Sequence, residues 1–135
     1  MALSEIKAIA SQGLIQQRLI VEAAGLNIAN ANRMVNQGTN VPLYHVDVES
    51  NSFADLVAGN DSKGAHIVSV NAPLKSHFSP TDPNADVQGM VWRPDIDTTQ
   101  QLIDVVSANR AYEANLRIYN AASSMGKQIM KLGSN

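Results

Sequence analysis

The 135-residue chain contains no cysteine and few aromatic residues, and each shortage removes a class of protein. The absence of cysteine excludes disulfide bonds, thiol catalysis and cysteine-ligated metal sites. Aromatic residues make up only 4% of the sequence, so a core must be built from aliphatic side chains and alanine. The length fits one modest domain, which we expect to cover residues 1–135.

Charged residues and long apolar runs are also scarce. The formal net charge is −2 and lysine and arginine form no tract, so we expect no nucleic-acid partner. The sequence has no run of 18 apolar residues, the length that a transmembrane helix needs. Near the N-terminus Glu5, glutamines and Arg18 interrupt the apolar residues, whereas a secretory signal needs a continuous apolar segment. We therefore expect any export to proceed without a cleaved signal peptide.

Two terminal segments, residues 3–32 and 98–132, have the heptad-like spacing of long helices. Thr98 and Gln101 have the spacing of a capping box, and Gly133 stands where a helix is expected to stop. The second segment carries a stripe in steps of three and four residues. This predicted stripe consists of Leu102, Val105, Asn109, Tyr112, Leu116, Tyr119, Ala122, Met125, Ile129 and Leu132.

Residues 33–97 separate the two predicted helices and contain all five prolines. Turn signals alternate there with short strand-like stretches, which are Tyr44–Val48, His66–Val70 and Val87–Trp92. The sequence thus predicts a mainly α fold. Long N- and C-terminal helices pair as an antiparallel coiled-coil hairpin, with a small β-rich, loop-rich insert between them. Both helices are apolar on more than one face, so the hairpin is expected to oligomerise.

The few candidates for catalysis or metal binding have plainer structural interpretations. His45 and Asp47 share one face of a predicted strand, and with His66 they could hold a divalent ion, but no paired histidine motif accompanies them. Aspartates in the proline-rich turns commonly form side-chain turns or helix caps. No phosphate-binding glycine motif is present. We therefore predict no catalytic, cofactor-binding or metal-binding residues and no small-molecule substrate.

A polar segment, SANRAYEAN at residues 107–115, interrupts the second helix. Asn109 and Tyr112 belong to the predicted stripe, and a single asparagine in such a seam costs stability but fixes register and partner number. Spacing alone leaves two interpretations open. These side chains supply polarity inside one chain, or they set the register between subunits.

Three segments resemble bacterial flagellar rod and hook proteins. SANRAYEAN and the following NAASSMGKQIMKLG (120–133) are similar to the C-terminal signature of that family, and NIANAN (27–32) to its N-terminal asparagine motif. PNADVQGMVWRPDID (83–97) looks like a run that is most typical of the C-type proximal rod proteins. The sequence departs from the family pattern where Asn32, Arg33 and Met34 replace the usual continuation. Residues 46–80 give no match.

The resemblance implies a structural subunit of the flagellar basal-body proximal rod. Such subunits are exported unfolded through the type III apparatus and polymerise with themselves and other rod subunits. They form a periplasm-spanning axial tube that transmits torque from motor to hook, beside ring and export-apparatus components. The expected subunit-interface residues are Asn27, Asn30, Asn109, Arg110, Tyr112, Asn115, Leu116, Tyr119 and Met125. The alternatives are another proximal rod subunit, a small dimeric coiled-coil adaptor or chaperone, and a metal-assisted hydrolase using His45, Asp47 and His66.

Overall fold

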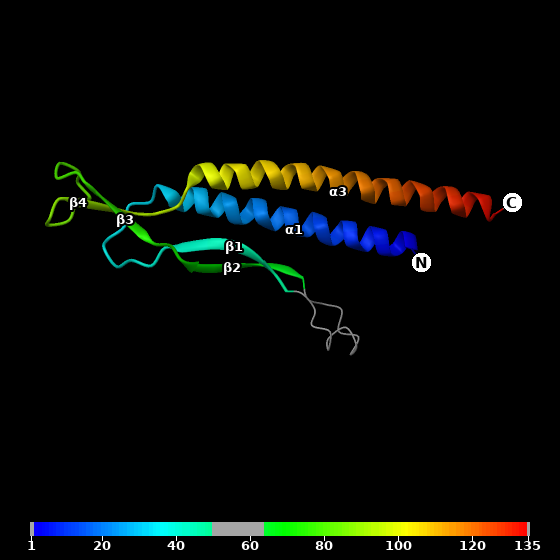
Figure 1. Cartoon of the computed structure of the whole chain (residues 1–135), viewed down its shortest axis with the longest axis horizontal. Helices are drawn as coiled ribbons and strands as arrows, with labels where there is room; N and C mark the ends of the chain where they lie inside the picture. Colours follow the sequence, from blue (N-terminus) through cyan, green and yellow to red (C-terminus); the bar gives the residue numbers. More distant parts are fainter. Residues whose placement is uncertain (1, 50–63, 135) are drawn as a thin grey trace.

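A computed structural model describes residues 2–49 and 64–134 (Figure 1). Along the chain, one long helix comes first, two small sheets follow, and a second long helix comes last. The elements are α1 (Ala2–Ala31), β1 (Pro42–Val48), β2 (Ala65–Asn71), β3 (Leu74–Phe78), β4 (Met90–Pro94) and α3 (Thr98–Leu132). The prediction of a mainly helical chain with terminal helices and a small β insert is confirmed. Within the described ranges, neither helix is long and apolar enough to cross a lipid bilayer.

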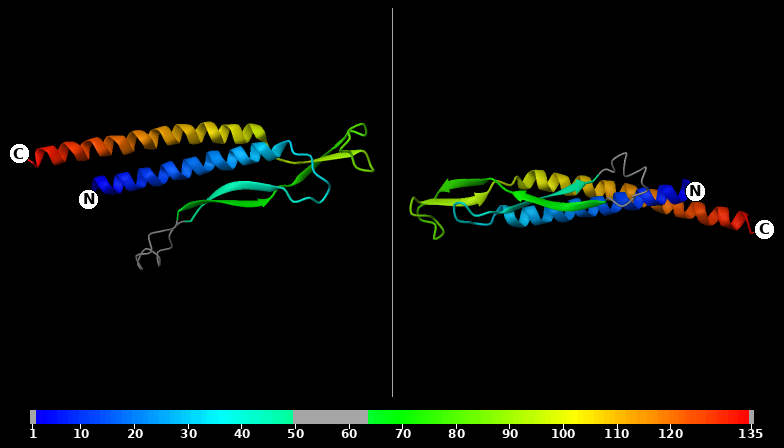
Figure 2. Two further views of the ribbon diagram at one scale, coloured as in Figure 1. Left: turned by 180° about the vertical axis from the view of Figure 1, so that it is seen from behind. Right: turned by 90° about the horizontal axis from the view of Figure 1, so that it is seen from below.

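Helices α1 and α3 lie side by side and run in opposite directions (Figures 1 and 2). Their contact is built from small side chains, because Ala10 and Ala24 of α1 and Ala108 and Ala122 of α3 are buried. The distance between two packed helices depends on the side chains at their contact, so alanines allow a close approach. Many of the larger aliphatic side chains of both helices are left exposed.

The N-cap of α3 is Asp97, and the capping box predicted from Thr98 is wrong. Asp97 has an extended backbone, and its Oδ1 accepts hydrogen bonds from the backbone N–H groups of Thr99 (2.9 Å) and Gln100 (3.2 Å). Thr98 is already the first helical residue. A cap residue must have non-helical dihedral angles while its side chain reaches back to the first free N–H groups, and here the aspartate does both.

The strands form two antiparallel hairpins. The β1–β2 hairpin runs along the side of α1 that faces away from α3, and the β3–β4 hairpin lies beyond the helix ends (Figure 2). The predicted strands Tyr44–Val48 and His66–Val70 lie within β1 and β2. The predicted strand Val87–Trp92 starts too early, because a turn occupies the residues before Met90, and β3 was not predicted.

A small apolar cluster joins the insert to the end of α1. Its buried members are Ala31, Val41, Ala72 and Ile96, with Val35, Leu43 and Leu74 packed against them. Backbone hydrogen bonds tie the same segments together: the Val35 N–H donates to the Trp92 carbonyl at 3.0 Å, and the Ala72 N–H donates to the Val41 carbonyl at 2.8 Å. This end of the molecule therefore has its own core, and it fixes the start of β1 next to the last turn of α1.

Candidate subunit interface

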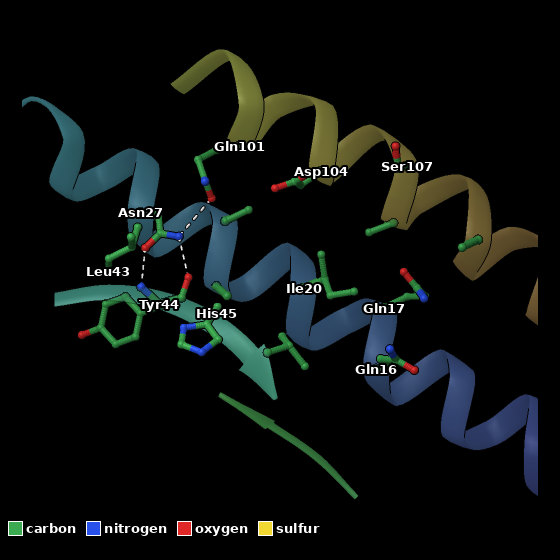
Figure 3. A pocket seen from close by; sticks show the side chains of 15 residues that line it. Gln16, Gln17, Ile20, Asn27, Leu43, Tyr44, His45, Gln101, Asp104 and Ser107 are labelled. Carbon is green, nitrogen blue, oxygen red and sulfur yellow. Dashed lines mark hydrogen bonds between the residues drawn. The ribbon is translucent and has the colours of Figure 1, made fainter. Parts of the chain in front are cut away.

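Asn27 connects three elements near the C-terminal end of α1. Its Nδ2 donates to the Tyr44 carbonyl of β1 at 2.7 Å and to Oε1 of Gln101 on α3 at 3.0 Å, and its Oδ1 accepts from the Tyr44 N–H at 2.7 Å (Figure 3). The side chain is only 2% exposed. One amide thus satisfies both backbone groups of Tyr44, as a neighbouring strand would, and holds α3 at the same point. We call Asn27, Tyr44 and Gln101 the asparagine clamp.

A groove lies directly beside the asparagine clamp, over α1 and between α3 and β1 (Figure 3). Its volume is about 680 Å³. The floor is largely apolar, with Ile20, Ala24 and Ala108 among its residues, and the α3 rim carries Asp104 and Ser107. Asp104 is the one carboxylate in the lining of this groove, and its Oδ1 accepts a hydrogen bond from Nε2 of Gln100 in its own helix, at 3.0 Å. We call this the β1–α3 groove.

Further along the helix pair, the contact depends on the absence of a side chain at Gly13. A Cβ atom built on Gly13 would lie 2.6 Å from Nδ2 and 3.0 Å from Cγ of Asn115. Asn115 is the last residue of SANRAYEAN and is half-buried against α1. Tyr119 lies one helical turn after Asn115 in α3. The ammonium group of Lys7 in α1 lies 5.2 Å from the centre of its ring, which is within the range of a cation–π contact.

The opposite flank of α3 contains the other polar residues of the segment. Asn109 and Tyr112 line a shallow pocket of about 180 Å³ together with Gln17, Arg18 and Val21 of α1. Asn109 is exposed, and Tyr112 is 39% exposed. These two side chains thus lie at the edge of the helix contact and not inside it.

Large aliphatic side chains remain uncovered along most of both helices. They are Ile6, Ile9, Ile15 and Leu26 on α1, and Leu102, Ile103, Val106, Leu116, Ile118, Met125, Ile129, Met130 and Leu132 on α3. Single apolar residues are normal on a protein surface, but many large exposed aliphatic side chains on two adjacent helices are typical of an interaction site. The arrangement can bind other helices.

Asp86 organises the turn that leads into β4. Its Oδ1 accepts from the N–H groups of Gln88 (2.8 Å) and Met90 (2.9 Å), and its Oδ2 accepts from the Trp92 indole at 3.1 Å. The Met90 N–H first, and then the Trp92 indole, hold the pKa of the Asp86 carboxyl below its ordinary value. Gly89 has a φ of +77°, which L side chains rarely adopt, so the turn also depends on this glycine. The aspartate thus has a structural function.

The histidines do not form a metal site in the part of the chain that the structure describes. His45, Asp47 and His66 share one face of the β1–β2 hairpin, where Asp47 lies opposite His66, and all three side chains are exposed. No group of three or more His, Cys, Asp or Glu residues among the described residues is placed to hold a metal ion.

Comparison with known proteins identifies the family. The sequence profile described as "Flagellar basal body rod FlgEFG protein C-terminal" matches residues 87–132. The flagellar basal-body rod protein FlgC of Escherichia coli is 31% identical over 134 residues, which cover 98% of this chain and 99% of the relative. The chain belongs to the flagellar basal-body rod protein FlgC family. FlgC of Bacillus subtilis (28% identical, 93% and 94% covered) and of Aquifex aeolicus (25%, 91% and 88%) are also similar.

In this FlgC-family chain, the predicted interface residues divide into two groups. Asn27, Asn30, Asn115 and Tyr119 face their own subunit, where Nδ2 of Asn30 donates to the Pro42 carbonyl at 3.4 Å. The others are exposed: Asn109, Arg110, Tyr112, Leu116 and Met125. In the first group Asn27 is buried and the other three side chains are half-buried, so the second group is the more accessible one.

In the first half of α3, members of the predicted stripe lie one residue away from the line that faces α1, whereas Tyr119 and Ala122 of the same stripe do lie against α1. In that first half the line runs through Gln101, Ala108 and Asn115. Their neighbours Leu102, Asn109 and Leu116 are exposed. Sequence reasoning missed Ala108 and Gly13, because it sought large apolar residues in the seam, whereas this FlgC-family seam uses small ones.

Proposed function

We propose that this chain is a structural subunit of the flagellar basal-body rod, which assembles with copies of itself and with other rod subunits. The single observation that carries the proposal is the uncovered aliphatic surface of α1 and α3, in a chain whose relatives are named flagellar basal-body rod proteins. Burying apolar surface contributes roughly 25 cal/mol per Å², so these faces supply the free energy of assembly.

The finer features belong to the same proposal. The helix pair functions as an antiparallel coiled coil in a proximal rod that forms an axial tube and transmits torque from motor to hook. The chain reaches a rod that spans the periplasm through the type III apparatus, without a cleaved signal, and meets ring and export-apparatus components there. Residues 1–135 form one domain in this account, with the insert of residues 33–97 carried between the helices of residues 3–32 and 98–132.

Within this proposal, the nine predicted interface residues have two different roles. Asn27, Asn30, Asn115 and Tyr119 shape the subunit, so they act on assembly through the fold. Asn109, Arg110, Tyr112, Leu116 and Met125 contact neighbouring subunits directly. The distinction follows from their burial in the isolated chain.

The test is complementation of a strain that lacks the gene for this chain, followed by electron microscopy of isolated basal bodies. Leu116→Gln removes apolar surface from an exposed position, and we expect shortened or absent rods and non-motile cells although the variant protein is present. His66→Ala is the control on the exposed face of β2, outside the groove lining, and we expect normal rods and swimming. Loss of motility in His66→Ala with intact rods would indicate a chemical function and overturn the structural proposal.

A further inference from the structure

The last turns of helix α3 carry apolar side chains that its own chain leaves largely exposed, although Lys127 and Met130 line a shallow pocket together with Leu3 and Lys7 of α1. The N-terminus of α1 stops short of the C-terminus of α3, so the last turns of α3 extend past it (Figure 1). All described side chains in residues 127–132 are exposed; Ile129 is 56% and Leu132 is 78% exposed. We call Lys127–Leu132 the α3 tip.

The β1–α3 groove provides an apolar surface against which the α3 tip could pack. It lies toward the other end of the helix pair. Its apolar floor, with Ile20, Ala24 and Ala108, can cover aliphatic side chains. Its volume of about 680 Å³ falls within the range of about 300–1,000 Å³ found for cavities that bury a bound group.

The charges of the two surfaces are complementary. The α3 tip carries Lys127 and Lys131 and no acidic residue, whereas the groove lining contains the carboxylate of Asp104 and no lysine or arginine. Opposite charges at the edge of an apolar contact add specificity and select the orientation of the partner. A like-charged partner surface is therefore disfavoured at the Asp104 rim.

We propose that the α3 tip of one copy of this chain binds in the β1–α3 groove of a second copy. The bound segment is residues 127–132 of an identical chain. Ile129 and Leu132 lie on the groove floor, and a lysine of the segment lies next to Asp104. Because the two surfaces differ and lie toward opposite ends of the molecule, the contact is heterologous. A heterologous contact that does not close into a ring extends into a helical filament. The inference rests on the proposed function, to which it adds the partner and the polarity of assembly.

The absence of cysteine makes a direct test possible, since any introduced cysteine is the only thiol in its chain. Met130→Cys in the α3 tip and Ser107→Cys on the groove rim are prepared as separate full-length proteins, one of them with an added tag, and are mixed under oxidising conditions. We expect a disulfide-linked product that contains one copy of each. Glu113→Cys, also exposed on α3 but outside the groove lining and outside the predicted interface residues, is the matched control and is expected to give at least about fivefold less product with Met130→Cys.

Charge reversal provides a second test in the same cross-linking experiment. Asp104→Lys in the Ser107→Cys partner should lower the yield about fivefold, and Lys127→Asp with Lys131→Asp in the Met130→Cys partner should restore it. Equal yields from the groove and control cysteines, or no restoration by the double reversal, would overturn the proposal. A groove cysteine that links in cells to a different protein and not to the α3 tip would also overturn it, because the occupant would then be another partner.

The same cysteine variants separate this inference from the proposed function. If the single variants complement a deletion strain and build rods, but the mixed pair gives no cross-link in those rods, the docking of the α3 tip is wrong and the structural function stands. If unsubstituted protein expressed in the deletion strain fails to enter basal bodies, the proposed function itself is wrong.

Discussion

The two ends of the helix pair differ in how far they depend on other molecules. At the end near Asn27, a buried amide hydrogen-bonds β1 and α3, and Val41 lies in an apolar cluster with 0% exposure. Toward the other end, α1 and α3 touch through small side chains such as Ala10 and Ala122, and Ile9, Met125 and Leu132 are left in solvent. We therefore expect the first end to fold alone and the second to be completed by neighbouring subunits in the proposed assembly.

This difference accounts for how one chain combines a fixed shape with a capacity to assemble. A helix in solution is marginal unless an apolar face is packed, so the end near Asn27 must hold the helices in register. The far end then presents aliphatic side chains at a defined spacing. If the whole pair were sealed by large apolar residues, the subunit would be more stable but would leave less surface for its partners.

The largest effect on the isolated chain is expected from breaking the asparagine clamp. Asn27→Ala leaves the half-buried N–H and carbonyl of Tyr44 without their partner, and an unsatisfied buried group costs about 1–3 kcal/mol. Because these groups are only partly buried, we expect the free energy of unfolding to fall by about 1–3 kcal/mol in urea titrations. Asn120→Ala, an exposed position in α3, is the control and should change it by less than about 0.5 kcal/mol. Equal losses in both variants would remove the distinction between the two ends.

A smaller effect is expected at Gly13, which can be compared with Gly25 in the same helix. Gly25→Ala adds a methyl group with nothing within 4 Å, so it should stabilise the chain by about 0.5–1 kcal/mol through helix propensity. Gly13→Ala would place the same methyl group 2.6 Å from Nδ2 of Asn115, and displacing that side chain should cancel the gain or reverse it. Thermal unfolding measures both variants, and an equal gain in each would show that Asn115 is not held at the seam.

Acid should disturb the turn before β4 without unfolding the helices. The pKa of Asp86 is lowered in the folded chain, so its carboxylate stabilises the turn above the ordinary aspartate pKa of about 3.9 and loses this contribution as pH falls through the lower folded value. Trp92 is the only tryptophan, so its fluorescence reports the change directly. Asp86→Asn should abolish this acid transition. If the transition persists in the variant, another group causes it.

The smallest effect on the isolated chain is expected at Met125, which is 55% exposed. Met125→Gln should change the free energy of unfolding by less than about 0.5 kcal/mol, because little apolar surface is buried there in one subunit. The same variant should impair rod assembly in a complemented deletion strain, as judged by electron microscopy. A large loss of stability in the purified protein would place Met125 in the core of the subunit.

The sequence was sufficient to predict the long helices, three of the four strands (one with too early a start) and the family, because these follow from local periodicity, turn residues and motifs. It was insufficient for contacts between distant residues. Asn27 stood out in NIANAN, but its partners lie 17 and 74 positions away and carry no local signal. Strand β3 follows Pro73 and contains a lysine, a serine and a histidine, so only its pairing with β4 makes it a strand.

The one-residue displacement of the predicted stripe has a similar cause. Leu102 and Leu116 fit a heptad as well as any core residue, and the alanine that lies against α1, Ala108, is one position away. Which line faces inward is decided by the small residues of α1, such as Gly13 and Ala24, and by the clamp at Gln101. The periodicity of a single helix contains no information about the partner helix.

Hydrogen exchange of the purified chain, compared at dilute concentration and in the assembled rod, tests the contrast between the two ends most directly. In the dilute protein we expect strong amide protection in the turns around Asn27 and Gln101, and weak protection over residues 3–9 and 120–130. Assembly should raise protection most at the weak end. Uniform strong protection of both helices at low concentration would contradict this account, because the far end would then need no partner.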